Sequence, residues 1–215
     1  MKKRILSLAL ALIIVMSASV GAYAANGFNK SVFDTAADVS VKRDDMTGSL
    51  VAVSESLLGL DGTVVPQTGG GYVNLNMGVG ISDSMNLSML IFKYYADDWA
   101  FINSVIIKIG NKRYTFDNLS IDRDVFKDST IRESFSIEIT SKSMPMMADL
   151  IAHRNEEIKV RLQGRNRDID FTLTDEMKNG IINIWNLYSA GGGTSSASMK
   201  MADIGSDIDV TIGQD

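Results

Sequence analysis

The chain carries one histidine, His153, and no cysteine, and these two counts restrict the chemistry open to it. A zinc site here would need three carboxylates or waters around one imidazole, an unusual ligand set. A histidine-based triad would have to use His153. That residue stands near the end of a predicted helix, where an imidazole usually interacts with the helix dipole and solvent. We therefore predict no metal site, no cofactor and no catalytic residue.

Paired carboxylates are the next residues with catalytic potential. They occur at Asp44-Asp45, Asp97-Asp98 and Glu156-Glu157. Glycoside hydrolysis needs two carboxyl groups about 5 to 10 Å apart across a sugar bond. Adjacent residues of a strand point to opposite faces, so no pair meets this need by itself. Asp97-Asp98 differs from the other two pairs because a large aromatic residue, Trp99, follows it.

The segment around Trp99 is the candidate ligand-binding site. A sugar-stacking surface of Tyr94, Tyr95 and Trp99 is one interpretation. The other, which we favour for Trp99, is that its indole closes one end of the hydrophobic core. The predicted site residues are Tyr95, Asp97, Asp98 and Trp99.

Two weaker patterns indicate turns rather than sites. Asp117, Asp122 and Asp124 offer hard oxygen ligands for calcium, but the central Gly and final Glu of an EF-hand loop are missing. The stretch 69–71 is three glycines, without the Gly-Lys-Ser/Thr ending of a phosphate loop. We interpret both as turn residues.

The first 24 residues have the composition of a cleavable secretory signal peptide. Three basic residues at 2–4 precede an apolar run at 5–16, and Ala22-Tyr23-Ala24 supplies the small residues that signal peptidase requires. An uncleaved anchor is the alternative, because the uncharged stretch 5–25 has 21 residues, enough to span a bilayer. The Ser, Ala and Gly content of its second half favours cleavage, and hence a secreted or periplasmic protein without a membrane span.

Removal of this segment leaves 191 residues with 18 basic and 26 acidic side chains, a net charge of −8. Such a chain is unsuited to neutralising phosphates, which argues against binding to nucleic acids or anionic membranes. Since an exported chain without cysteine has no disulfides, its core must hold the fold. A chain of roughly 190 residues can form such a core. We expect a lead-in at 25–37 and one globular domain at 38–190.

Alternating apolar residues predict a mostly antiparallel β-sheet or sandwich. The clearest strand is 73–81, and the denser apolar run 85–95 predicts a central strand. Gly110-Asn111 predicts a type II′ hairpin, because glycine supplies the positive φ. Residues 119–125 should pair with 131–139, where Glu133 is the one charge on the apolar side. Further strands are expected at 39–42, 158–162 and 169–173, while the run 50–60 fits strand or helix equally.

Two helices are expected late in the chain. Ser143 can cap the first, with Pro145 in its opening turn, and Thr174 can cap the last. One apolar stripe should pack the last helix on the sheet. It consists of Met177, Ile181, Ile184, Trp185 and Tyr188. Strands and hairpins followed by late helices indicate an α+β fold rather than a doubly wound parallel one.

Residues 191–215 are expected to form a Gly/Ser linker and an acidic tail. Within the tail, Ile208, Val210 and Ile212 alternate with polar residues, a short strand pattern on a tether. This strand could add to the sheet edge of a partner, close the sheet of its own chain, or stay disordered.

Together these features favour an exported, non-enzymatic binding or structural module of the bacterial cell envelope or the secreted space. An envelope protein or a glycan is the expected partner, and no nucleic acid. The alternative is a carboxylate-dependent envelope hydrolase of the glycoside type, using Asp97 or Asp98 beside Trp99.

Overall fold

The computed structural model describes residues 27–54, 65–66, 71–83, 85–125, 130–193 and 210–214. The predicted signal peptide, the second half of the ambiguous run 50–60 and the turn at 127–129 lie outside these residues. The described residues form two antiparallel sheets with two α-helices late in the chain, which confirms the predicted α+β class. Within the same residues, neither α-helix has the length and apolar character that crossing a bilayer requires.

Sheet A has seven strands in the order β1-β2-β4-β5-β9-β8, with the short β3 paired to β4. Its strands are β1 (Val39–Arg43), β2 (Leu50–Ser54), β3 (Val65–Pro66), β4 (Tyr72–Ile81), β5 (Asn86–Ala96), β8 (Asp122–Val125) and β9 (Ile131–Glu138). The ambiguous run 50–60 thus begins as a strand. The run 85–95 supplies the central strand β5, as its apolar residues on both faces predicted.

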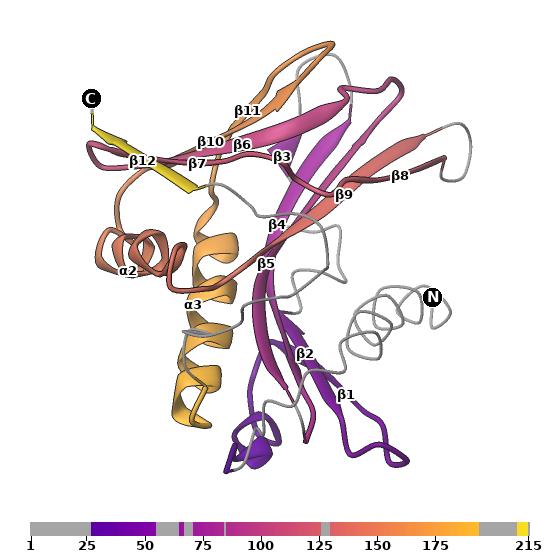
Figure 1. Cartoon of the computed structure of the whole chain (residues 1–215), viewed down its shortest axis with the longest axis vertical. Coiled ribbons are helices and arrows are strands. Elements are labelled where there is room, and N and C mark those ends of the chain that lie inside the picture. The colour runs from indigo at the N-terminus through magenta and orange to yellow at the C-terminus, as the bar shows by residue number, and fades with distance from the viewer. Residues whose placement is uncertain are drawn as a thin grey trace.

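Sheet B has five strands in the order β11-β10-β6-β7-β12. Its strands are β6 (Ile102–Ile109), β7 (Lys112–Phe116), β10 (Ile158–Gly164), β11 (Ile169–Thr172) and β12 (Val210–Gln214). The hairpin between β6 and β7 is confirmed. Gly110 has a φ of 57° and Asn111 keeps a negative φ, as a type II′ turn requires. The tail strand β12 lies at the edge of its own chain's sheet (Figure 1).

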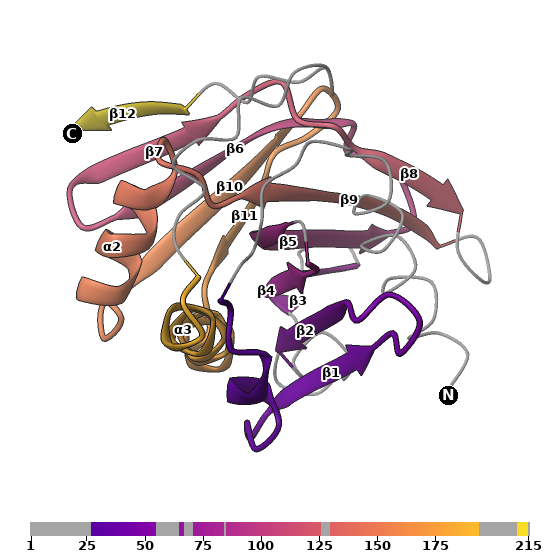
Figure 2. The same cartoon turned by 60° about the horizontal axis from the view of Figure 1, so that its bottom comes forward.

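The helix α3 (Asp175–Ala190) packs with one side against sheet A. Every member of its predicted stripe is buried, and the helix contacts β2, β4 and β5. In Figure 2, where α3 is seen end on, it lies to one side of the sheets and below α2 (Met144–Ala152). The predicted cap is also confirmed, since Thr174 Oγ1 accepts a hydrogen bond from the Met177 N–H at 3.2 Å.

Ser143 precedes α2 as predicted, but its side chain does not cap the helix. Its hydroxyl accepts a hydrogen bond from the Thr140 N–H at 2.8 Å and donates one to the Glu138 carbonyl oxygen at 2.8 Å. The tight turn that leaves β9 therefore engages this hydroxyl before the helix N–H groups can. The local sequence pattern did not reveal this competition.

The segment before β1 joins the end of α3. It contains the 3-10 helix η1 (Lys30–Phe33), and the Phe28 ring lies 6.4 Å from that of Phe33 and 5.7 Å from that of Tyr188. The Asn29 N–H also donates to the Gly191 carbonyl oxygen at 2.8 Å. Aromatic contacts and one main-chain bond thus tie the start of the described chain to its last helix.

Sheet A has an inner face in the main core and an outer face with its own buried residues. Strand alternation places Val51, Leu87, Met89 and Ile91 on the outer face, where they form a small apolar cluster.

Lys93 follows on the same face of β5, opposite Asn74 of β4 and Ser134 of β9. It is only 8% exposed. Burial, and secondarily the charge of Arg132, lowers the pKa of Lys93 to about 8.

We predict that Lys93→Met stabilises the protein at neutral pH. The folded pKa lies below the value of 10.5 for a free lysine, so below about pH 8 the buried ammonium group opposes folding. This charge lowers the free energy of unfolding by roughly 3 kcal/mol, and the effect disappears as the pH rises toward 10.5. Urea unfolding at pH 7 should give a higher free energy of unfolding for Lys93→Met than for the unchanged protein, and this difference should be smaller at pH 10. Lys159→Met, at an ammonium 60% exposed, is the control and should show neither effect. A pH-independent difference would contradict the assignment.

Candidate functional site

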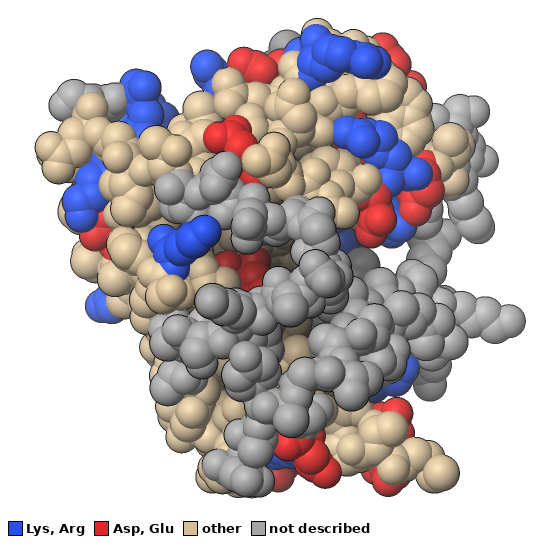
Figure 3. Space-filling view, in the orientation of Figure 1, with Lys and Arg blue, Asp and Glu red and all other residues tan. Residues whose placement is uncertain are grey.

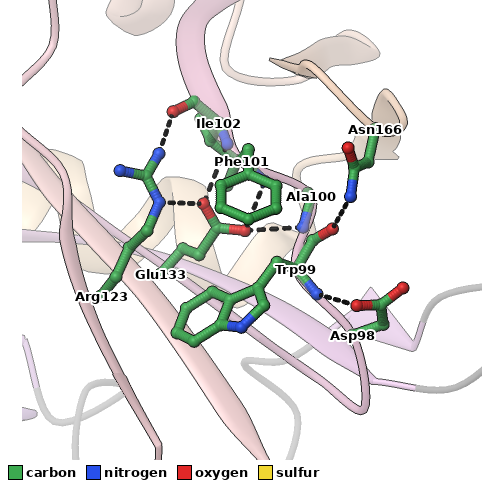
Figure 4. Close-up of polar contacts among 8 residues, drawn as sticks. All are labelled: Asp98, Trp99, Ala100, Phe101, Ile102, Arg123, Glu133 and Asn166. Atoms are coloured by element: carbon green, nitrogen blue, oxygen red, sulfur yellow. Dashed lines mark hydrogen bonds and ion pairs between the residues drawn. The ribbon is translucent and has the colours of Figure 1, made fainter.

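The chain passes from sheet A to sheet B through residues 97–101, here called the crossing loop, which joins β5 to β6. This loop contains Asp97, Asp98 and Trp99, three of the four predicted site residues. Asp97 and Asp98 are exposed, and Trp99 is half-buried and packs against the main core. Figure 4 draws Asp98 to Ile102 with three of the residues that contact this segment, Arg123, Glu133 and Asn166.

Glu133 of β9 holds the crossing loop from the side of sheet A. Its side chain is 0% exposed, and its carboxylate accepts three consecutive backbone N–H groups, from Ala100 (2.7 Å), Phe101 (2.9 Å) and Ile102 (2.9 Å). Arg123, directly opposite on β8, places its Nε 3.1 Å from Oε2 (Figure 4). A buried carboxylate is stable only when its charge is paired and its oxygens are hydrogen-bonded. These four donors satisfy both conditions.

Phe101 is held in an unusual backbone conformation. Its φ of 55° lies in the left-handed region that bulky residues rarely adopt, at a cost on the order of 1 to 3 kcal/mol. Its N–H is fixed by Glu133, and its carbonyl oxygen accepts the Arg165 N–H at 3.1 Å. Two guanidinium groups lie over its ring, that of Arg165 at 4.4 Å and that of Arg123 at 5.6 Å from the centroid. Contacts from both sheets therefore determine this conformation.

The hairpin between β10 and β11 holds the loop from the side of sheet B. The Asn166 N–H donates to the Ala100 carbonyl oxygen at 3.0 Å, and Asn166 Nδ2 donates to the Trp99 carbonyl oxygen at 3.1 Å. Arg167 Nη2 donates to the Asp98 carbonyl oxygen at 3.0 Å and also contacts the Tyr94 hydroxyl. Carbonyl groups of consecutive loop residues thus point toward the hairpin, while N–H groups point toward Glu133.

The exposed side of the loop combines rings with both signs of charge. The Trp99 and Phe101 rings lie 6.1 Å apart with an interplanar angle of 34°. Exposed carboxylates at Asp97 and Asp98 and the exposed guanidinium of Arg165 lie close to these rings in sequence or in space. Figure 3 shows basic and acidic side chains intermixed at the upper end of the molecule, over β8 and the β10–β11 hairpin. Rings can stack on apolar surfaces of a ligand, and the charged groups can hydrogen-bond its hydroxyls.

Tyr95, the fourth predicted site residue, lies elsewhere. It is on the outer face of sheet A, where its ring stacks on that of Tyr72 at 4.6 Å. Tyr94 points the opposite way and is 1% exposed in the main core. The sugar-stacking surface of Tyr94, Tyr95 and Trp99 is therefore not formed, because strand alternation separates the two tyrosines. Trp99 pairs with Phe101 instead.

His153 follows the end of α2, as the sequence predicted. Its Nδ1 lies 2.9 Å from Glu156 Oε1, and Lys112 forms an ion pair of 2.8 Å with the neighbouring Asp149. The Tyr114 hydroxyl also donates to Asp149. In the part of the chain that the structure describes, no three His, Asp or Glu side chains gather closely enough to hold a metal ion.

No protein-family model, curated protein or solved structure matches this chain. The candidate site therefore rests on the geometry of the described residues. The sequence interpretation did not include Phe101, Arg123, Arg165 or Arg167. One signal pointed to an arginine such as Arg123: a charge at Glu133 on the apolar face of a strand requires donors, and arginine is a usual source of them.

We predict that Glu133→Gln destabilises the protein by about 2 to 4 kcal/mol. The amide group cannot accept with its nitrogen, so at least one loop N–H loses its partner, and Arg123 loses its counter-charge. Chemical unfolding measures the change. Glu157→Gln is the matched control, because that carboxylate is exposed and ion-paired with Lys159 at the surface. Equal stability of the two variants would show that the carboxylate does not hold the loop.

We predict that Gly164→Ala loosens the crossing loop. An added Cβ would lie 2.4 Å from the Ala100 carbonyl oxygen of the loop and 2.6 Å from the Arg167 carbonyl oxygen of the β10–β11 hairpin, so main-chain atoms would have to move. Overpacking of this kind costs about 1 to 3 kcal/mol. Amide hydrogen exchange at Arg165 and Asn166 should accelerate. Gly213→Ala, where a Cβ meets no atom within 4 Å, should leave that exchange unchanged.

Proposed function

We propose that this chain is an exported, non-enzymatic binding module that holds a glycan of the cell envelope or secreted space on its crossing loop. The observation that carries the proposal is the strained Phe101, fixed beside Trp99 by contacts from both sheets. Strained backbone that is retained by its surroundings is typical of functional sites. A surface fixed before the ligand arrives loses little conformational entropy on binding.

A glycan suits the chemistry of this surface. The apolar faces of sugar rings stack on aromatic side chains, and the half-buried Trp99 ring offers such a face beside Phe101, whose own ring carries the Arg165 and Arg123 guanidinium groups. Sugar hydroxyl groups donate to carboxylates and accept from guanidinium groups, which Asp97, Asp98 and Arg165 offer at the exposed side of the loop. A flat apolar protein surface would use the rings but leave these charges unsatisfied.

The carboxylates of the site favour binding over hydrolysis. Glu133, the buried one, has its oxygens engaged by main-chain N–H groups and Arg123. Asp98 accepts the Trp99 N–H at 2.8 Å. Asp97 and Asp98 are both exposed, whereas a general acid for glycoside cleavage is usually set in an apolar pocket. The arrangement supports a role in positioning a ligand.

An extracytoplasmic location agrees with the composition. The first 24 residues have the pattern of a secretory signal, and the chain uses no cysteine. The net charge of −8 that remains after cleavage favours a neutral or weakly charged ligand over a polyanion.

We predict that the mature chain, residues 25–215, binds neutral β-linked oligosaccharides or insoluble peptidoglycan, and that Trp99→Leu weakens this binding about tenfold. Leucine keeps apolar bulk toward the core while removing the ring. Asp97→Asn should weaken binding less, because an amide still accepts hydrogen bonds. Isothermal titration with chitohexaose and cellohexaose, and co-sedimentation with peptidoglycan, provide the measurements.

Tyr72→Leu is the matched control, since this aromatic residue lies on the outer face of sheet A. Equal losses in Trp99→Leu and Tyr72→Leu would remove the crossing loop from the binding site. Release of shortened sugars by the purified chain, abolished by Asp98→Asn, would replace binding with hydrolysis as the function.

A further inference from the structure

The C-terminal strand β12 is attached to the rest of the molecule in an unusual way. Among the described strands it pairs with β7 alone, in an antiparallel ladder from Val210 opposite Phe116 to Gln214 opposite Lys112. Its described side chains face mainly solvent, and Ile212 is 49% exposed. None of them belongs to the main core cluster. Main-chain hydrogen bonds therefore provide nearly all of its attachment.

The strand that receives β12, β7, is also held by contacts that do not involve β12. β7 is hydrogen-bonded along its other edge to β6 over five residue pairs. Its Tyr114 and Phe116 side chains are fully buried, and the Tyr114 hydroxyl is bonded to Asp149 of α2. Removal of β12 would expose a row of unpaired main-chain N–H and C=O groups, and such an edge is a template for another strand.

The connection that leads to β12 is long in sequence. Sixteen residues, 194–209, separate the end of the described α3 region from Val210. Such a connection can span roughly 50 Å when extended. It can therefore bring the strand to β7 of a neighbouring molecule as well as to its own. The two pairings contain the same contacts, so the local concentration of the tethered strand, about millimolar for short linkers, decides between them.

Register, rather than charge, matches the donor strand to this edge. The residues that β12 places opposite Lys112 and Arg113 are the uncharged Gln214 and Gly213. Recognition of the edge therefore rests on main-chain pairing, which the same strand of a second copy provides equally well.

We propose that the edge of β7 is an acceptor site for the C-terminal strand of a second copy of this chain. Reciprocal exchange of β12 closes a dimer, and one-way exchange builds an open chain of molecules. In either form each sheet B is completed by a strand from its neighbour. This interface lies on sheet B and is separate from the glycan site proposed on the crossing loop.

The natural absence of cysteine allows a direct test with full-length protein. Thr115 and Thr211 are opposite each other in the ladder, at a separation that a disulfide can bridge. Thr115→Cys and Thr211→Cys are made as separate variants, one of them tagged, mixed at about millimolar concentration and oxidised. We expect a disulfide-linked heterodimer that becomes more abundant with concentration.

Thr115→Cys mixed with Gln214→Cys is the control, because Gln214 lies three positions out of register. The proposal is overturned if this pair forms as much heterodimer as the matched pair. It is also overturned if the double variant Thr115→Cys/Thr211→Cys closes its disulfide within one molecule at every concentration. Absence of any cross-link, within or between molecules, would show that β12 does not occupy this edge and would equally reject the proposal.

Discussion

The fold depends on one buried negative charge. Glu133 sits where the chain leaves sheet A for sheet B, and it accepts three N–H groups that the passing backbone would otherwise leave without partners. Main-chain groups that pass through a core must be hydrogen-bonded, and a sharp crossing between sheets provides no ladder to do this. A carboxylate supplies the acceptors, and Arg123 supplies the counter-charge that makes its burial tolerable.

The same constraint shapes the candidate site. Because Glu133 and the β10–β11 hairpin hold opposite sides of the crossing loop, Phe101 keeps a left-handed backbone and its ring stays beside that of Trp99. Stability and presentation of the loop surface thus have one physical cause. The sequence element that connects the sheets is therefore also the element that we propose to hold a ligand.

The crossing loop and the C-terminal strand β12 are attached to the rest of the molecule in different ways. The crossing loop is fixed by buried polar contacts from several strands, so it has one arrangement. The strand β12 is held at the rim by main-chain bonds, with exposed side chains and a long connection. Burial restricts the contacts of the crossing loop to its own molecule. The main-chain contacts of β12 can be formed equally well with β7 of a neighbouring molecule. A fixed loop and the strand exchange that we propose for β12 are therefore compatible in one chain.

The sequence by itself determined the elements whose causes are local. Period-two patterns located the strands, Gly110 specified its hairpin, and Thr174 with the apolar stripe defined α3, because each depends on residues a few positions apart. Strand alternation even separates Tyr94 from Tyr95, although the sequence interpretation grouped them. Tertiary structure alone decided which donors meet Glu133, why Phe101 is strained, and that β12 pairs with β7. These outcomes depend on groups far apart in the chain, and a local sequence pattern does not predict which distant backbone segment will pack against it.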